Sequence, residues 1–280
     1  MARRLLATIA ICTGCAVTAA NAGGAGGPGA GVQQGWDGLA SGVVRYVAVP
    51  AGNSTTVQVI RRRDGRVLKF MALDGAWGIP MVAFDGTTDG LMADGRTLLL
   101  GDATGGPGLR KHSTFALVDL KKMRVVRKLR LPGHHVFDAL SPDGRYLYFI
   151  QYVSAQDFNR YRVRAYDLRA GRLLANPVVD KRESADAMQG APISRVTSQD
   201  GSWAYTLYGG PHETFIHALD TLNAGAVCID LPWKTQPKRL YEFRIRRVGD
   251  GRLIVRGPRG RTLAVVNQDN LHVVSAVRDP

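Results

Sequence analysis

The sequence is poor in cysteine, in helical periodicity and in long apolar runs. Cysteine occurs three times, and Cys12 and Cys15 fall in an N-terminal segment that we expect to be removed. The mature chain then keeps Cys228 alone, which excludes an internal disulfide and a cysteine-based metal centre. Cys228 stands in the apolar run Ala226–Ile229 and is interpreted as a small buried hydrophobe. From Val43 onward no stretch has the apolar spacing of a helix, and β-rich runs separated by turn residues predominate.

Two motifs of common enzyme classes are also missing. The Gly-rich stretch 101–108 lacks the Gly-Lys-Ser/Thr ending of a phosphate-binding loop, and no helix is expected after it. We interpret this stretch as a flexible connection between strands. No Gly-x-Ser-x-Gly nucleophile elbow occurs, so a hydrolase of that class has no support.

What the chain does have is an ordinary globular composition with a strong excess of positive charge. Of its 280 residues, 45% are hydrophobic and 21% are charged, which is enough apolar material for a full core. Lysine and arginine number 37 against 23 aspartates and glutamates, a formal net charge of +14. This excess favours solubility and attraction to anionic partners, and it says nothing about the fold.

The N-terminal residues have the features of a secretory signal peptide. Arg3 and Arg4 give a positive start, an apolar stretch follows, and small residues precede a cleavage position after Ala22. We therefore assign residues 1–22 as a signal peptide and expect a secreted or cell-envelope protein with no transmembrane span in its mature form. An uncleaved membrane anchor and a lipid anchor at Cys15 are the alternatives.

Residues 39–280 contain a repeated unit that begins with an Asp-Gly turn. The turn recurs about every fifty residues, at Asp94, Asp143, Asp200 and Asp250. A second turn follows an apolar strand in each copy, at Asp119, Asp167, Asp220 and Asn267. Four strand-like runs in each copy are the signature of a propeller blade. We predict an all-β fold, a single β-propeller of about five four-stranded blades, or six if the preceding segment contributes more.

The first copy is incomplete, because strand signals appear only at 43–49, 55–60 and 66–73. A strand from one terminus is therefore expected to complete the sheet that the other terminus begins. The preceding residues 23–38 are rich in Gly and Ala without periodicity, and we interpret them as a flexible linker.

The third copy carries a resemblance to a known family. The stretch Leu140–Tyr148 reads Leu-Ser-Pro-Asp-Gly-Arg-Tyr-Leu-Tyr, and Ala165–Leu173 reads Ala-Tyr-Asp-Leu-Arg-Ala-Gly-Arg-Leu. Both resemble the blades of the YVTN and WD40-like bacterial propellers, which include TolB-like and lactonase-like proteins. The chain departs from the family in having no Tyr-Val-Thr-Asn run and no Trp-Asp at the end of a blade. The resemblance implies a propeller fold and no particular substrate.

Alignment of the copies predicts a polar site at the propeller axis. Five residues before each turn aspartate stand Asp89, Asp138, Arg195 and Ile245. Equivalent positions on the innermost strands form a ring around the channel, and two carboxylates with a guanidinium could hold a polar ligand or supply acid–base chemistry. The alternative is a salt-bridge network that satisfies buried charges. A shift of one residue in the alignment would turn these side chains to the other face.

Histidines provide a second set of candidates. His135 precedes the inner strand of the third copy and is added to the axial site, while His134 beside it points the opposite way in a strand. His212 lies in a loop of the fourth copy, with His217 beyond it. No cofactor is predicted; a divalent cation would need one histidine and a carboxylate such as Asp138. Surface or capping histidines are the alternative.

Basic residues form the third set. The region 234–261 is dense in arginine, and from it we select Arg244, Arg246, Arg247 and Arg256 as candidate polyanion-binding residues. Protection of an edge strand from aggregation is the alternative role. Further basic groups occur at 61–63 and 121–130. No nucleic-acid module is recognisable, so we expect no specific binding of nucleic acid.

Together these features predict a non-catalytic binding or scaffold protein of the cell envelope. Its expected partner is an envelope protein or an anionic envelope polymer, and the protein itself is expected to be a monomer. A lactonase-like propeller hydrolase that uses Asp89, Asp138 and Arg195 is the alternative, so whether the chain is an enzyme stays open at this point.

Overall fold

The structure is a computed structural model, and it describes residues 31–105, 108–157, 160–182, 189–210, 213–233, 239–249, 251–278 and 280. The signal-peptide assignment and residues 23–30 of the linker lie outside the described residues, as do Asp250 and His212. The described part is almost entirely β-structure, with two short 3-10 turns at Leu240–Glu242 and Pro258–Gly260. A helix with the length and apolarity needed to cross a membrane does not occur in it.

Five antiparallel sheets form the five blades of a β-propeller. Four sheets have four strands in sequence order, and the second has a fifth strand, β1, added at its edge. Blade 1 comprises β2 (Gly35–Ser41), β3 (Val44–Ala51), β4 (Ser54–Arg61) and β5 (Val67–Asp74). Blade 2 comprises β6 (Trp77–Pro80), β7 (Thr97–Asp102), β8 (His112–Asp119) and β9 (Arg124–Pro132). Blade 3 comprises β10 (His135–Leu140), β11 (Tyr146–Tyr152), β12 (Tyr161–Asp167) and β13 (Arg172–Leu173).

Blade 4 comprises β14 (Ala191–Thr197), β15 (Trp203–Gly209), β16 (Thr214–Asp220) and β17 (Gly225–Asp230). Blade 5 comprises β18 (Arg244–Val248), β19 (Arg252–Arg256), β20 (Thr262–Asn267) and β21 (Val273–Ala276). The predicted fold class and the count of five blades are confirmed.

The segment before residue 39 departs from the prediction. Residues 32–38 were expected in a flexible linker, but Val32–Gln33 forms β1, which pairs with β6 as an added strand of the second sheet. The next strand, β2, completes blade 1 by pairing with β3. Each terminal blade is therefore complete with its own strands, and the expected exchange of a strand between the termini does not occur. The Gly-rich composition of Gly35–Ser41 concealed this strand, because glycine weakens the sequence signal of a strand.

The Asp-Gly turns have the local chemistry that the sequence predicts. Ser141 Oγ donates to Asp143 Oδ1 over 2.6 Å and accepts from the Tyr146 amide over 2.8 Å, and Gly144 has a φ of 68°. Serine bonds its own turn in this way, and glycine supplies the positive φ. The turn at Asp200 repeats the arrangement, and its hydrogen bonds, above all that from Ser198, lower the pKa of Asp200 to about 2.

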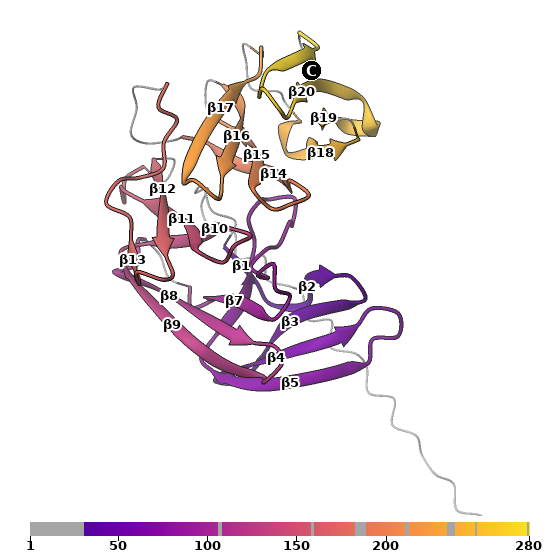
Figure 1. The fold of residues 1–280 in the computed structure, drawn as a ribbon. Coiled ribbons are helices and arrows are strands. Elements are labelled where there is room, and N and C mark those ends of the chain that lie inside the picture. Colours follow the sequence, from indigo (N-terminus) through magenta and orange to yellow (C-terminus); the bar gives the residue numbers. More distant parts are fainter. Residues whose placement is uncertain are drawn as a thin grey trace, which may run out of the picture.

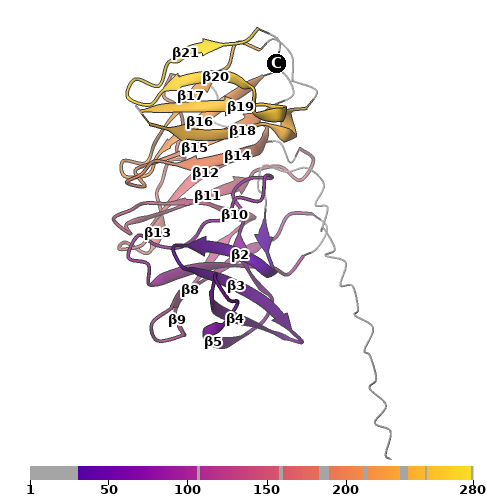
Figure 2. The ribbon, with the colours of Figure 1, turned by 90° about the vertical axis from the view of Figure 1, so that its right-hand side faces the viewer.

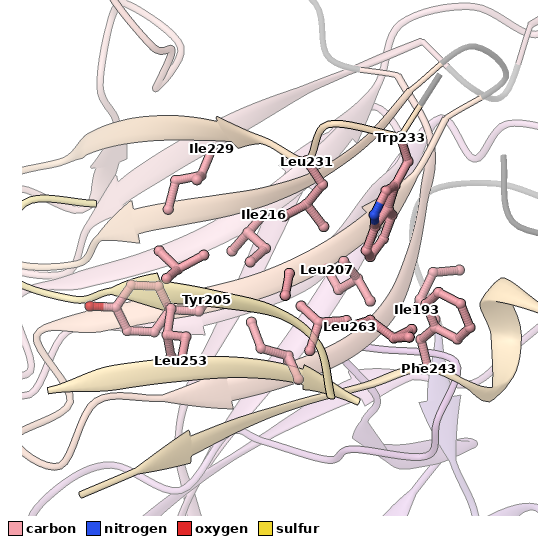
Figure 3. Packing of buried hydrophobic residues seen from close by; sticks show 14 of the residues in the cluster. Ile193, Tyr205, Leu207, Ile216, Ile229, Leu231, Trp233, Phe243, Leu253 and Leu263 are labelled. Carbon is pink, nitrogen blue, oxygen red and sulfur yellow. The ribbon is translucent and has the colours of Figure 1, made fainter. Parts of the chain in front are cut away.

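Four apolar cores join the blades in sequence, 1 with 2, 2 with 3, 3 with 4 and 4 with 5. Figure 3 shows the last of these, where Leu207 and Ile216 of blade 4 face Leu253 and Leu263 of blade 5. Across the described ranges no comparable core joins blade 5 to blade 1. The propeller is therefore an open arc, with the indigo blade 1 and the yellow blade 5 at its two ends (Figures 1 and 2).

Burial along the strands follows the position of the blade in this arc. In blade 4, β16 is buried over nearly its whole length, and its sequence Thr-Phe-Ile-His-Ala-Leu is almost continuously apolar. In blade 5, β19 alternates, with Arg252 and Arg256 exposed and Leu253 and Val255 buried. A strand covered on both faces has a continuous apolar run, whereas a strand with one solvated face alternates. Blade 5 therefore keeps one face open to solvent.

Candidate functional site

Asp138 and Arg195 form a buried ion pair where the innermost strands of blades 3 and 4 meet. Arg195 Nη2 donates to Asp138 Oδ1, and Arg195 Nη1 donates to the Asp138 carbonyl oxygen over 3.0 Å. The two side chains are only 2% and 3% exposed. Burial lowers the pKa of Arg195, but the charge and hydrogen bond of Asp138, together with the interactions with Tyr208 and Asp89, outweigh burial, so the pKa is raised. Arg195 therefore stays charged, and the pair is shielded from solutes in this conformation.

A β-bulge in β10 lies at Asp138, whose side chain reaches Arg195. The register of β10 against β11 shifts between Phe137 and Ala139, so that Asp138 is the additional residue. Phe137 packs in the core shared with blade 2, whereas Ala139 packs in the core shared with blade 4. A bulge re-aims the side chain at its position in this manner.

Asp89 reaches the pair from a loop rather than from a strand. It lies in the segment 81–96 between β6 and β7, and its Oδ1 accepts the Gly90 amide over 2.6 Å. Burial raises the pKa of Asp89, the charge of Arg195 lowers it, and the charge of Asp138 raises it. The structure thus brings together the three charged residues that the repeat alignment selected. Ile245, at the fourth aligned position, is buried in the core between blades 4 and 5.

The same loop crosses the axis and ties blade 2 to blade 4 (Figure 1). The Phe84 amide donates to the Pro192 carbonyl over 2.9 Å, and the Asp85 amide donates to the Ile193 carbonyl over 3.1 Å. The Phe84 ring lies 6.5 Å from the ring of Tyr241, at the entrance to blade 5. The loop therefore connects blade 2 to blade 4 near the axis.

His135 does not join this group. Its ring meets Phe149 edge-on at 6.2 Å, and Phe149 belongs to the core between blades 2 and 3. Alternation along β10 explains the difference, because His135 and Phe137 face blade 2, whereas Val136 and Asp138 face blade 4. Burial lowers the pKa of His135 to about 4, so the imidazole is neutral at pH 7. His134 contacts neither group, and its ring lies 4.6 Å from the Tyr152 ring in a tilted arrangement.

Sequence reasoning missed a row of polar residues that continues outward from Arg195. Thr206 on β15 is the cross-strand partner of Arg195, and His217 on β16 is the partner of Thr206, so the three side chains share the face toward blade 3. Asp138 Oδ2, Arg195 Nε, Thr206 Oγ1 and His217 Nε2 are buried without a hydrogen-bond partner among the described residues. Buried groups of this kind bind ordered water in most proteins. Burial lowers the pKa of His217 to about 4.

A metal-binding set is not apparent at the axis. No group of three His, Cys, Asp or Glu side chains suited to a metal ion occurs in the part of the chain that the structure describes. The carboxylates whose charges act on Arg195 are those of Asp138 and Asp89. The ion pair between Asp138 and Arg195 fits the salt-bridge alternative considered from the sequence, and ligand binding by these residues stays a prediction.

The arginines of blade 5 form an exposed array on its open face. Paired residues on adjacent strands share a face, and Arg244 is paired with Arg256, Arg246 with Ile254, and Val248 with Arg252. The opposite face carries Ile245 and Leu253, which pack toward blade 4. We call the four residues Arg244, Arg246, Arg252 and Arg256 the arginine face.

Arg247 is not part of the arginine face. It is paired with the buried Leu253, and its Nη1 donates to the Thr197 carbonyl of blade 4 over 3.2 Å. Strict alternation along β18 directs Arg247 to the other side of the sheet from Arg244, Arg246 and Arg256, so the structure separates it from the other three candidates. Arg252 is the fourth member of the arginine face instead. Lys234 and Lys238 of the same basic region lie outside the described residues.

Few carboxylates balance the arginine face. Asp85 Oδ2 lies 4.0 Å from Arg244 Nε. Arg246, Arg252 and Arg256 are exposed, and within the described ranges none of them has an ion pair. Four guanidinium groups with one distant carboxylate give a positive potential over this face, which attracts anions.

No protein-family model matches the chain, and no curated protein matches it. Solved structures do. NirN, a dihydro-heme d1 dehydrogenase in complex with DHE, is 15% identical with a TM-score of 0.50, and the match covers 84% of this chain and 44% of that one. The Dos1 propeller is 11% identical with a TM-score of 0.46, over 81% of this chain and 55% of that one.

Hydrazine synthase from Kuenenia stuttgartiensis is 19% identical with a TM-score of 0.41, over 67% of this chain and 48% of that one. The chain thus spans about half the length of these three structures. At such identities the likeness concerns the fold alone. The fold of the chain is that of a β-propeller.

Proposed function

We propose that this chain is an exported β-propeller of the cell envelope that binds an anionic envelope polymer through the arginine face and catalyses no reaction. The arginine face carries the proposal, because it is a solvated sheet surface with four guanidinium groups and almost no carboxylates. Guanidinium groups in a row suit the repeated anionic groups of a polymer, since each can make paired hydrogen bonds to a carboxylate or phosphate. The ion pair at the axis serves as a structural support of the scaffold.

Two finer assignments belong to the same proposal. The Ser-Pro-Asp-Gly turn supports membership of the YVTN and WD40-like propellers, and the charged start and small residues before residue 23 support export. Mass spectrometry of protein recovered from the producing cells tests export. A mature chain that begins at residue 23 is expected, and a chain that keeps residues 1–22 contradicts cleavage.

Binding is tested with labelled dextran sulfate as the anionic probe and neutral dextran as its uncharged counterpart. The triple variant Arg246→Gln, Arg252→Gln, Arg256→Gln should weaken binding about tenfold, on the basis of roughly 0.5 kcal/mol for each exposed contact. Wild-type affinity should fall as salt rises from about 0.1 M to about 0.5 M, since exposed charges are screened.

A charge-matched control separates this site from the general effect of net charge. The variant Lys122→Gln, Arg124→Gln, Arg130→Gln removes three cations from blade 2, where they are also exposed. Its affinity for dextran sulfate should lie within about twofold of the wild-type affinity, because an interaction between exposed charges beyond the Debye length is screened. Equal losses of affinity in the two triple variants would show that overall charge attracts the probe, and would contradict a binding site on the arginine face.

A further inference from the structure

A groove with apolar walls lies between blades 1 and 2, away from the arginine face. Its volume is about 460 Å³, within the range of small-molecule sites. Val44 and Val59 of blade 1 and Leu120 of blade 2 form its walls together with Leu68. Leu68 is 42% exposed, which is unusual for a large aliphatic side chain on a sheet.

A bulge in blade 1 produces the exposure of Leu68. The register of β4 against β5 shifts where Val59 is paired with Lys69 and Ile60 is paired with Val67, so Leu68 is the additional residue. A bulged residue has no cross-strand partner and can be aimed away from the sheet. The bulge therefore places an apolar side chain at the groove.

A tyrosine hydroxyl is available in the same groove. Tyr46 is buried overall, but its hydroxyl makes no hydrogen bond with any described residue. Burial raises the pKa of Tyr46, so the hydroxyl keeps its proton and remains a donor at neutral pH. An anionic group in the groove would accept this hydrogen bond.

Three cations surround the groove, and none has an ion pair within the described residues. Lys69 Nζ lies 3.4 Å from the carbonyl oxygens of Leu120 and Lys121, which brings its charge across from blade 1 to blade 2. Arg96 and Lys121 line the groove from the two turns of blade 2 and are exposed. No carboxylate is among the lining residues.

The nearest acidic residues are held by their own turns. Asp94 Oδ1 accepts the amides of Arg96 and Thr97 over 2.8 and 3.1 Å. Asp119 Oδ1 accepts the amides of Lys121 and Lys122 over 2.8 and 2.9 Å. The two carboxylates keep their negative charge, and Asp119 interacts with Arg96. The three lining cations outnumber them, so the groove has a net positive rim above an apolar wall.

We infer that this groove binds an amphipathic anion, specifically a medium-chain alkyl carboxylate. The alkyl chain lies against Leu68, Val59 and Leu120, where its burial removes apolar surface from water. The carboxylate meets the ammonium and guanidinium groups of Lys69 and Arg96 and accepts from the Tyr46 hydroxyl. This site goes beyond the proposed function, because it lies in blades 1 and 2 and uses no residue of the arginine face.

Calorimetric titration of the full chain with three probes of equal chain length tests the inference. The probes are decanoate, decanol and decyltrimethylammonium, each kept below its aggregation concentration. Decanoate should bind at least about tenfold more tightly than the other two, because only decanoate satisfies both the apolar wall and the cations. Equal affinity for all three, or no binding of decanoate, would overturn the inference.

Single variants separate the contribution of the wall from that of the rim. Lys69→Met keeps an unbranched side chain and removes its charge, and Arg96→Gln removes the charge of the arginine in the Asp94 turn. Each variant should weaken decanoate binding about threefold. Leu68→Gln should weaken decanoate and decanol alike. The control Lys122→Gln removes a neighbouring charge that does not line the groove and should change affinity by less than about twofold. Unchanged affinity in both Lys69→Met and Arg96→Gln, with thermal melting showing that both are folded, would contradict the site.

Discussion

Arg244 and Arg256 stand directly opposite each other on neighbouring strands of the last blade. Like charges in opposite positions of an antiparallel pair destabilise a sheet. Arg244 has Asp85 within 4.0 Å, whereas Arg256 is exposed and has no ion pair among the described residues. The blade therefore carries a local electrostatic cost at the surface that we propose as its binding face.

The first prediction follows from this pair. Arg256→Gln should raise the free energy of unfolding by about 0.5 kcal/mol at low salt, because it removes the repulsion from Arg244. The gain should vanish near 1 M salt, where screening acts over about 3 Å. Urea unfolding at both salt concentrations measures the effect. Arg252→Gln is the matched control, since Arg252 lies opposite Val248 on the same strand; equal gains in the two variants would exclude the pairing as the cause.

The second prediction concerns the buried ion pair. Asp138→Asn or Arg195→Met should each lower the free energy of unfolding by about 3–5 kcal/mol, because each leaves one charge buried without its counterpart. The double variant Asp138→Asn, Arg195→Met should lose clearly less than the sum of the two single losses, since the two partners of the ion pair are removed together. Urea unfolding of the four proteins provides the comparison. Losses below about 1 kcal/mol in both single variants would show that the pair is solvated in solution.

The third prediction is a loss of stability in mild acid. Burial lowers the folded-state pKa of His135 and His217 to about 4, below the value of about 6.5 in an unfolded chain. The unfolded chain therefore binds more protons as the pH falls through this window, and the free energy of unfolding decreases from about pH 6.5 to about pH 4. Each histidine contributes a slope of about 1.4 kcal/mol per pH unit there.

Chemical unfolding at several pH values measures this slope. The free energy of unfolding of His217→Gln should depend less steeply on pH than that of the wild type, by the contribution of one histidine to the slope. His272→Gln removes an exposed imidazole and provides the comparison. Identical slopes in wild type and His217→Gln would contradict the burial of His217 in its neutral form.

The fourth prediction concerns the loop that crosses the axis. Phe84→Pro removes both the ring and the amide that bonds the Pro192 carbonyl, whereas Phe84→Ala removes the ring alone. The proline variant should be less stable than the alanine variant by about 1–3 kcal/mol, because the buried carbonyl of Pro192 loses its donor. Thermal unfolding of the two variants measures the difference. Equal stability would mean that the bond between blades 2 and 4 does not persist in solution.

The blade turns could be predicted from the sequence because their chemistry is local. Ser141, Asp143 and Gly144 bond within a few residues of one another, so the same residues imply the same turn wherever they occur. The repeat of that turn then fixed the blade count. The convergence of Asp89, Asp138 and Arg195 also followed from alignment, although Asp89 reaches the axis through a loop rather than the expected strand.

What could not be predicted depends on irregularity and on long-range packing. The bulge at Asp138 brings Asp138 and Ala139 to the same side of blade 3, which alternation along the sequence does not predict. His135, three residues before Asp138, faces blade 2 as alternation requires. The strand Gly35–Ser41 has too few β-branched residues to be recognised alone, and its partner β3 defines it. The open side of the arc depends on how the end blades pack, which no local pattern encodes. The side of the sheet on which Arg247 lies could have been predicted from the sequence, because alternation along β18 separates Arg247 from Arg246.

Blades 1 and 5 lie at the open side of the arc, and local unfolding should begin in these two blades. In a repeat protein each unit is held by the interfaces with its neighbours, and blades 1 and 5 each share one apolar core where blades 2 to 4 share two. Local opening should therefore begin at the outermost blades and spread inward. An anionic polymer bound to blade 5 would stabilise one of these end blades, because a ligand that binds only the folded state raises the free energy of unfolding. Attachment to the polymer would therefore also protect the blade from local opening.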